Sequence, residues 1–175
     1  MIDGAFTDNT GIGWAVAAGA TEVLALANGE VFESSWTQGF SELFAGAATS
    51  WGPKAFGGEY FQLFEETEQT FQDAVNSWPS LELASGSSGM LTEIRYGTLP
   101  VTTVANEGFG IVAGRAVTLK VVAVTTRGIA MGVSTDYFLY SALVNDITST
   151  FAAPANRDAT QEILKSFYLS AADTA

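Results

Sequence analysis

Polar and apolar positions near the N-terminus predict a short helix followed by a strand. Asn9 or Thr10 can cap a helix that runs through Ala18, because their side-chain oxygens can accept the first free amide hydrogens. Residues 21–28, TEVLALAN, are an apolar run typical of a buried parallel strand. Together with a strand that would end at Asp3, this order predicts a βαβ unit, in which functional residues gather at the carboxyl ends of strands.

Aromatic residues at helical spacing predict two further helices, over residues 35–48 and residues 59–78. The second should end before Pro79, which cannot continue a helix. Its apolar stripe comprises Tyr60, Phe64, Thr67, Phe71, Ala74 and Trp78. Its outward side carries Glu65, Glu66, Glu68 and Asp73, which we interpret as a solvated helix face in preference to a cation site.

Strand-like patterns follow residue 90. Residues 91–96 alternate, residues 101–104 are all β-branched, and residues 116–124, AVTLKVVAV, form a dense β run. Residues 106–114 contain glycines spaced G-x-G-x-x-x-G, which differs from the phosphate-binding G-x-G-x-x-G pattern, and an acidic residue stands beside them. This stretch therefore predicts a glycine-rich turn between two strands.

The last third of the chain predicts two helices, over residues 136–151 and residues 157–169, separated by a segment that contains Pro154. No internal repeat or long linker divides the sequence, so residues 1–175 are interpreted as one domain. The expected fold class is α/β. It would resemble α+β because the later strands follow one another without helices between them.

Composition excludes several classes of function. The net charge of −12 argues against direct electrostatic binding of nucleic acid or of an anionic membrane. The absence of histidine excludes His-dependent catalytic triads, and the absence of both cysteine and histidine excludes most zinc sites. No run approaches 18 apolar residues, so no transmembrane segment is expected. No targeting segment is visible, which leaves the cytoplasm as the default expectation.

The motif with the clearest chemical content is Asp3-Gly4-Ala5, which is followed by DNTGI over residues 8–12. From Asp3 to Asn28 the sequence resembles the region around the catalytic aspartate of patatin-like acyl hydrolases and the related group IV phospholipases. The resemblance implies a partial patatin-like sheet flanked by helices. It also implies that Asp3 is the base of a Ser-Asp dyad, with Gly4 and Ala5 forming the tight turn beside it. Such a dyad needs no histidine, cofactor or metal, because the aspartate itself accepts the serine proton.

The nucleophilic serine of that family has no counterpart in this sequence. In the family it lies in a Gly-x-Ser-x-Gly elbow before the aspartate, whereas only two residues precede Asp3 here. The nearest text, residues 85–89 (SGSSG), lies after the aspartate and is interpreted as a glycine-serine loop. The chain is therefore expected to be the C-terminal part of a larger catalytic domain that hydrolyses lipid esters, and to be inactive alone.

Other interpretations of the same residues remain open. Asp3-Gly4 also suits an ordinary turn, and Asp8 and Asn9 suit helix caps better than catalytic groups. A noncatalytic binding or oligomerisation module is the main alternative, because a partial sheet would expose strand edges that pair readily with another copy. Cation binding by Asp3, Asp8 and Asn9 is the weakest alternative, since the loop lacks the ligand pattern of an EF-hand.

Overall fold

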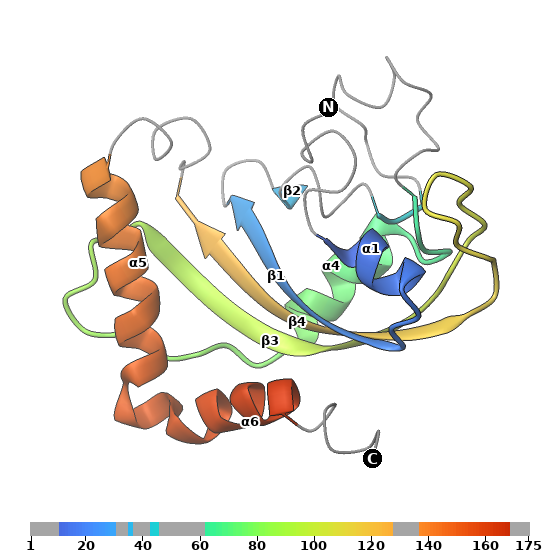
Figure 1. The fold of residues 1–175 in the computed structure, drawn as a ribbon. Helices are drawn as coiled ribbons and strands as arrows, with labels where there is room; N and C mark the ends of the chain where they lie inside the picture. Colours follow the sequence, from blue (N-terminus) through green and yellow to red (C-terminus); the bar gives the residue numbers. More distant parts are fainter. Residues whose placement is uncertain (1–10, 31–34, 37–42, 46–61, 128–136, 169–175) are drawn as a thin grey trace.

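The computed structural model describes residues 11–30, 35–36, 43–45, 62–127 and 137–168, and a mixed β-sheet lies at the centre of this part (Figure 1). Its strands are β1 (Glu22–Glu30), β2 (Ser35–Trp36), β3 (Leu91–Thr102) and β4 (Ala116–Thr126), arranged in the order β2-β1-β4-β3. β1 is parallel to β4, whereas β3 is antiparallel to β4. Because residues 103–115 join β3 to β4 without a helix, the sheet combines α/β and α+β features, as the sequence predicted.

Helices cover both faces of the sheet (Figure 1). Helices α1 and α4 contribute to the hydrophobic core on one face, called the first face here, and α5 and α6 pack on the opposite, second face. Their bounds are α1 (Ile12–Ala17), α4 (Glu68–Ser77), α5 (Tyr137–Ala152) and α6 (Arg157–Tyr168), with a 3₁₀ turn, η2 (Pro154–Asn156), between the last two. The helices thus pack on both sides of the central β-sheet.

The ends of the helices follow local chemistry. Thr67 caps α4 by accepting a hydrogen bond from the Thr70 amide at 3.1 Å, and Pro79 follows directly after the helix C-cap. α1 differs from the prediction that Asn9 or Thr10 caps it, because Gly11 occupies the N-cap with a φ of 73° and no side-chain cap bond. Glycine adopts this left-handed conformation without the steric cost that a Cβ brings.

Two predicted helices are wrong, one of them in part, where the structure describes them. Within residues 35–48, Ser35 and Trp36 form strand β2, paired with Glu30 and Gly29 of β1, and residues 43–45 form a turn and an isolated bridge. Of the described residues 62–78, residues 68–77 are helical, so the second prediction is right for that part and wrong for residues 62–67. Phe64 instead pairs with Thr103 in an isolated bridge, so this part of the aromatic stripe packs from extended chain.

β3 is one continuous strand that includes the predicted strand-like run at residues 91–96, the start of the run at residues 101–104, and residues 97–100 between them. The backbone amides of Tyr96 and Thr102 point away from β4. Pro100 lies an even number of residues from both, so its nitrogen points to the same side. Its missing N–H therefore does not interrupt the ladder with β4. Gly97 is required for packing, because a Cβ at this position would overlap the indole ring of Trp78.

The outer edge of β3 is covered by other parts of the chain. The Leu81 amide donates to the Ile94 carbonyl at 2.8 Å, and the Tyr96 amide donates to the Pro79 carbonyl at 3.4 Å. Farther along, the Glu66 carboxylate accepts from the Thr102 amide at 2.9 and 3.0 Å. These contacts give this edge strand partners along much of its length.

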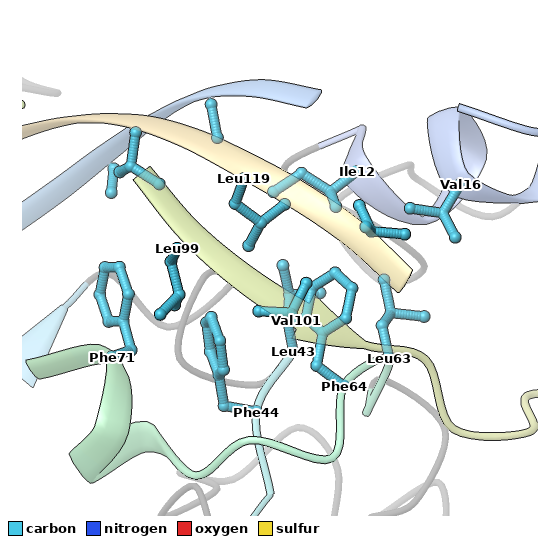
Figure 2. Packing of buried hydrophobic residues seen from close by; sticks show 14 of the residues in the cluster. Ile12, Val16, Leu43, Phe44, Leu63, Phe64, Phe71, Leu99, Val101 and Leu119 are labelled. Carbon is cyan, nitrogen blue, oxygen red and sulfur yellow. The ribbon is translucent and has the colours of Figure 1, made fainter. Parts of the chain in front are cut away.

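The core of the first face consists of aromatic and aliphatic side chains from distant parts of the chain (Figure 2). Phe44 stacks on Phe71, with ring centroids 5.1 Å apart, and lies 5.7 Å from Phe64. These rings pack against residues of β3 and β4 such as Leu99 and Leu119. The fully buried members on the second face are instead aliphatic: Leu81, Leu91, Ile94, Val122, Val124 and Ile163.

Candidate functional site

The residues that the sequence singled out as a catalytic motif lie outside the described part of the chain. These are Asp3, Gly4, Ala5, Asp8 and Asn9. The structure begins at Gly11, immediately after the motif, and therefore neither places these side chains nor brings them together. The expectation that Asp3 is a catalytic base stays a prediction.

The segment that follows the motif is held firmly against the rest of the fold. The Arg115 guanidinium donates hydrogen bonds to the Val16 carbonyl at 3.0 Å and to the Ala20 carbonyl at 3.4 Å. These carbonyls lie at the end of α1, where a cation also interacts favourably with the helix dipole. Trp14 meets Phe109 edge to face, with ring centroids 5.2 Å apart. α1 is thus fixed to the loop that joins β3 to β4.

A serine and a buried carboxylate meet on the second face. The Ser88 hydroxyl donates to Asp146 Oδ2 at 2.6 Å, and the Ser88 amide contacts both carboxylate oxygens at 3.0 Å. Asp146 belongs to α5 and is only 7% exposed, whereas Ser88 is exposed in the loop of residues 85–89. Gly86 and Gly89 flank it with φ values of 83° and 80°. The sequence was right that this stretch is a loop, but it did not predict its carboxylate anchor.

We interpret the Ser88–Asp146 contact as structural. The carboxylate binds both the amide and the hydroxyl of one residue, which is how a short loop is tied to a helix. The Ser88 hydroxyl oxygen also accepts a hydrogen bond from the Met90 amide at 3.3 Å. A hydrolytic nucleophile would need donors for the oxyanion and a substrate cleft beside it. The groove described next is lined by other residues.

An open groove of about 570 Å³ lies between α6 and the second face of the sheet and extends to the edge of β3. Its volume is within the range of about 300–1,000 Å³ that is usual for small-molecule sites. Leu24 of β1, Val122 of β4 and Ile163 of α6 contribute apolar surface. Tyr96, Thr98, Lys120, Glu162 and Lys165 contribute polar groups. An apolar surface with a few polar groups is typical of ligand sites.

Two of the polar groups in the groove already have partners. Lys120 Nζ forms an ion pair with Glu22 Oε2 at 2.9 Å. The pKa of Tyr96 is raised above its ordinary value, first because burial disfavours the phenolate and then because the charge and hydrogen bonding of Glu162 oppose ionisation. At neutral pH the phenol is therefore protonated. Lys165 makes no ion pair with any residue in the described part of the chain.

Metal coordination receives no support from the described residues, in which no group of three His, Cys, Asp or Glu side chains could hold an ion. The acidic residues predicted on one helix face are dispersed, because Glu66 precedes α4 and binds the Thr102 amide. Within the same described ranges, no helix has both the length and the apolar character needed to span a membrane.

Comparison with known proteins adds no assignment: no family model, no curated protein and no solved structure matches this chain. The groove residues were not predicted from the sequence either. One signal was available, since Lys120 interrupts the otherwise apolar run of β4 and a lysine inside such a run must reach solvent or a partner. Lys165 and Glu162 resemble ordinary surface residues of a helix, and only the fold brings them to Lys120.

Proposed function

We propose that this chain is part of a lipid acyl hydrolase in which Asp3 is the base of a Ser-Asp dyad. The observation that carries the proposal is the motif Asp3-Gly4-Ala5, which in the sequence precedes a helix and a strand, α1 and β1. β1 also lies in parallel to another strand of the sheet, β4, although α4 and β3 separate the two along the chain. The 175 residues contain no histidine, so within this chain a carboxylate such as Asp3 is the natural general base.

In the proposed reaction the Asp3 carboxylate accepts the proton of a serine hydroxyl supplied by a segment outside these 175 residues. The serine oxygen attacks the ester carbonyl, and the alcohol leaves with a proton. Water, deprotonated by the same aspartate, then attacks the acyl-enzyme, the acid is released, and the serine oxygen takes the proton back from Asp3. The substrate class is therefore a carboxylic ester of a lipid, and the chain alone lacks the covalent route.

The test compares hydrolysis of p-nitrophenyl butyrate by the 175-residue chain and by the translation product of the same reading frame extended upstream. We expect turnover only in the longer product, with a loss of about 10³-fold or more on Asp3→Asn. Asp8→Asn is the matched control, because it removes a carboxylate from the same segment and should leave turnover unchanged. Retention of activity by the Asp3→Asn variant of the longer product would exclude Asp3 as the base.

Ser88 provides the second control. If the 175-residue chain itself hydrolyses the ester and loses this activity on Ser88→Ala, the Ser88–Asp146 contact is catalytic and the chain does not depend on an outside serine. That result would overturn the proposal. Labelling with a fluorophosphonate gives an independent readout, since the chain alone should remain unlabelled.

The second candidate function is noncatalytic ligand binding, which is favoured by the groove between α6 and the sheet. Its apolar surface from Leu24, Val122 and Ile163 and its polar groups are formed by described residues alone. Binding there requires no serine and no contribution from Asp3. The two candidates are compatible, because α1 packs on the first face and the groove lies on the second.

A further inference from the structure

The groove between α6 and the second face has an apolar floor that the fold does not cover completely. Leu24 is only half-buried, whereas the neighbouring residue Ala25 is buried. Leu26, two residues farther along β1 on the same face, is 70% exposed but lies outside the groove lining. A helix covers Val122 of β4, but the apolar surface continues past it to β1. An elongated apolar group could therefore lie along this floor and remove more of it from water.

The cations of the groove are unusual for this chain. The protein contains three lysines, and two of them, Lys120 and Lys165, line the groove. Nineteen Asp and Glu residues against seven Lys and Arg make most of the surface unfavourable for an anion. In the groove, the Lys120 ammonium group is paired with Glu22, and the carboxylate of Glu162 also lines the groove. None of the described residues forms an ion pair with Lys165, so Lys165 is the groove cation that a ligand can approach.

We propose that the groove binds an alkyl carboxylate, with the chain along Leu24, Val122 and Ile163 and the carboxylate at Lys165. Thr98 and the lysine ammonium groups supply hydrogen-bond donors for the carboxylate oxygens. Nucleic acids and other polyanions are poor ligands here, since the net charge of −12 repels them beyond the few groove cations. The inference deepens the second candidate function, names its ligand class, and does not depend on Asp3.

The experiment is isothermal titration calorimetry of the full chain at pH 7.5. The probes are decanoate, dodecanoate and dodecyltrimethylammonium. We expect dodecanoate to bind at least threefold more tightly than decanoate, because the added methylenes leave water. We expect the cationic probe to bind roughly tenfold more weakly than dodecanoate, even though the net charge of the protein favours a cation.

Two pairs of variants locate the site. Lys165→Gln should weaken dodecanoate binding roughly threefold to fivefold, whereas Arg157→Gln removes a charge from the other end of α6 and should have no effect. Leu24→Thr should weaken it roughly tenfold, whereas Leu26→Thr alters the same strand outside the groove lining and should change little. Thermal melts of each variant would show that the fold is retained.

Several outcomes would overturn the inference. Equal affinity for the anionic and cationic probes would show that the lysines do not contribute to binding the carboxylate. Equal effects of Leu24→Thr and Leu26→Thr would place the alkyl chain elsewhere, and an unchanged affinity in Lys165→Gln would exclude its proposed contact with the carboxylate. The acyl hydrolase proposal is tested separately. Asp3→Asn should change ester hydrolysis in the longer product but should not change dodecanoate binding.

Discussion

The two faces of the central sheet are stabilised in different ways. On the first face, the buried rings of Phe44, Phe64 and Phe71 pack on β3 and β4, and two of them come from described residues outside any helix. On the second face the helices add buried polar side chains, Asp146 and Asn156 among them. Packing by large apolar groups depends on volume, whereas hydrogen bonds specify which backbone atoms meet.

This difference explains how the second face can contain an open groove without losing its helices. Asn156 binds the Glu82 amide and carbonyl at 2.9 and 2.7 Å, so the turn between α5 and α6 is tied to the segment before β3. Asp146 ties the middle of α5 to Ser88. The helix pair is therefore positioned by a few directed contacts, and α6 does not need to cover all of β1.

The largest effect is expected on the first face. Phe71→Ala should reduce the free energy of unfolding by about 3–5 kcal/mol, because Phe71 is fully buried and contacts Phe44 and Trp78. Urea unfolding followed by circular dichroism would measure the loss. Val112→Ala, at a position 63% exposed, is the control and should change stability little. A cost for Phe71→Ala below that of Asn156→Ala would contradict the proposed division between the faces.

A smaller and more local effect is expected from Asn156→Ala. The variant leaves the buried Thr150 carbonyl and the Glu82 backbone groups without their side-chain partner, at a cost of about 2 kcal/mol. Amide hydrogen exchange should accelerate at Glu82 before it changes at Leu119. Asn156→Asp keeps the acceptor for the Glu82 amide and should retain its protection in part. If amide hydrogen exchange accelerated equally on both faces, the Asn156 hydrogen bonds would not be a local anchor.

The smallest effect concerns pH and Tyr96. Burial, followed by the charge and hydrogen bonding of Glu162, raises the pKa of this phenol above the ordinary value of 10.0, so the folded state keeps the proton longer than the unfolded state does. Its contribution to stability is complete below about pH 10 and is lost as the pH rises through the folded-state pKa. Tyr96→Phe should therefore flatten the alkaline decline in melting temperature. Tyr140→Phe, at a position 54% exposed, should leave that decline unchanged.

Regular elements with a complete local pattern were predictable from the sequence. The run at residues 116–124 became β4, Ala116–Thr126, and the last two predicted helices became α5 and α6 with ends shifted by one residue. The parallel character of the strand predicted at residues 21–28 is confirmed by its pairing with β4. In these segments hydrophobic periodicity and the tertiary environment agree.

Elsewhere local patterns were misleading because tertiary contacts decided the backbone conformation. The predicted runs at residues 91–96 and 101–104 meet in one strand, β3, in which Gly97 leaves room for the Trp78 ring and Pro100 lies on the outward alternation of an edge strand. Phe64 has helical spacing to Phe71, but it packs from extended chain paired with Thr103. Spacing alone could not separate an aromatic helix face from aromatic residues that meet in one core.

The candidate sites show the same limit. The Asp3-Gly4-Ala5 motif could be found in the sequence because its residues are contiguous, although its role stays a prediction. The groove joins Leu24, Tyr96, Lys120 and Lys165 from three strands and a helix, and no short stretch contains them together. Its detection required the strand order and the position of α6.

The covered edge of β3 also has a consequence for self-association and misfolding. Residues 79–81 and 63–66 already occupy much of that edge, and Pro100 offers no amide to an incoming strand. Amyloid-like growth by addition of strands should therefore be blocked on this side of the molecule. On the opposite side, the pairing seen among the described residues joins β2 to Gly29 and Glu30 of β1. If the chain does aggregate through its sheet, the fibril-forming contact should begin at β1.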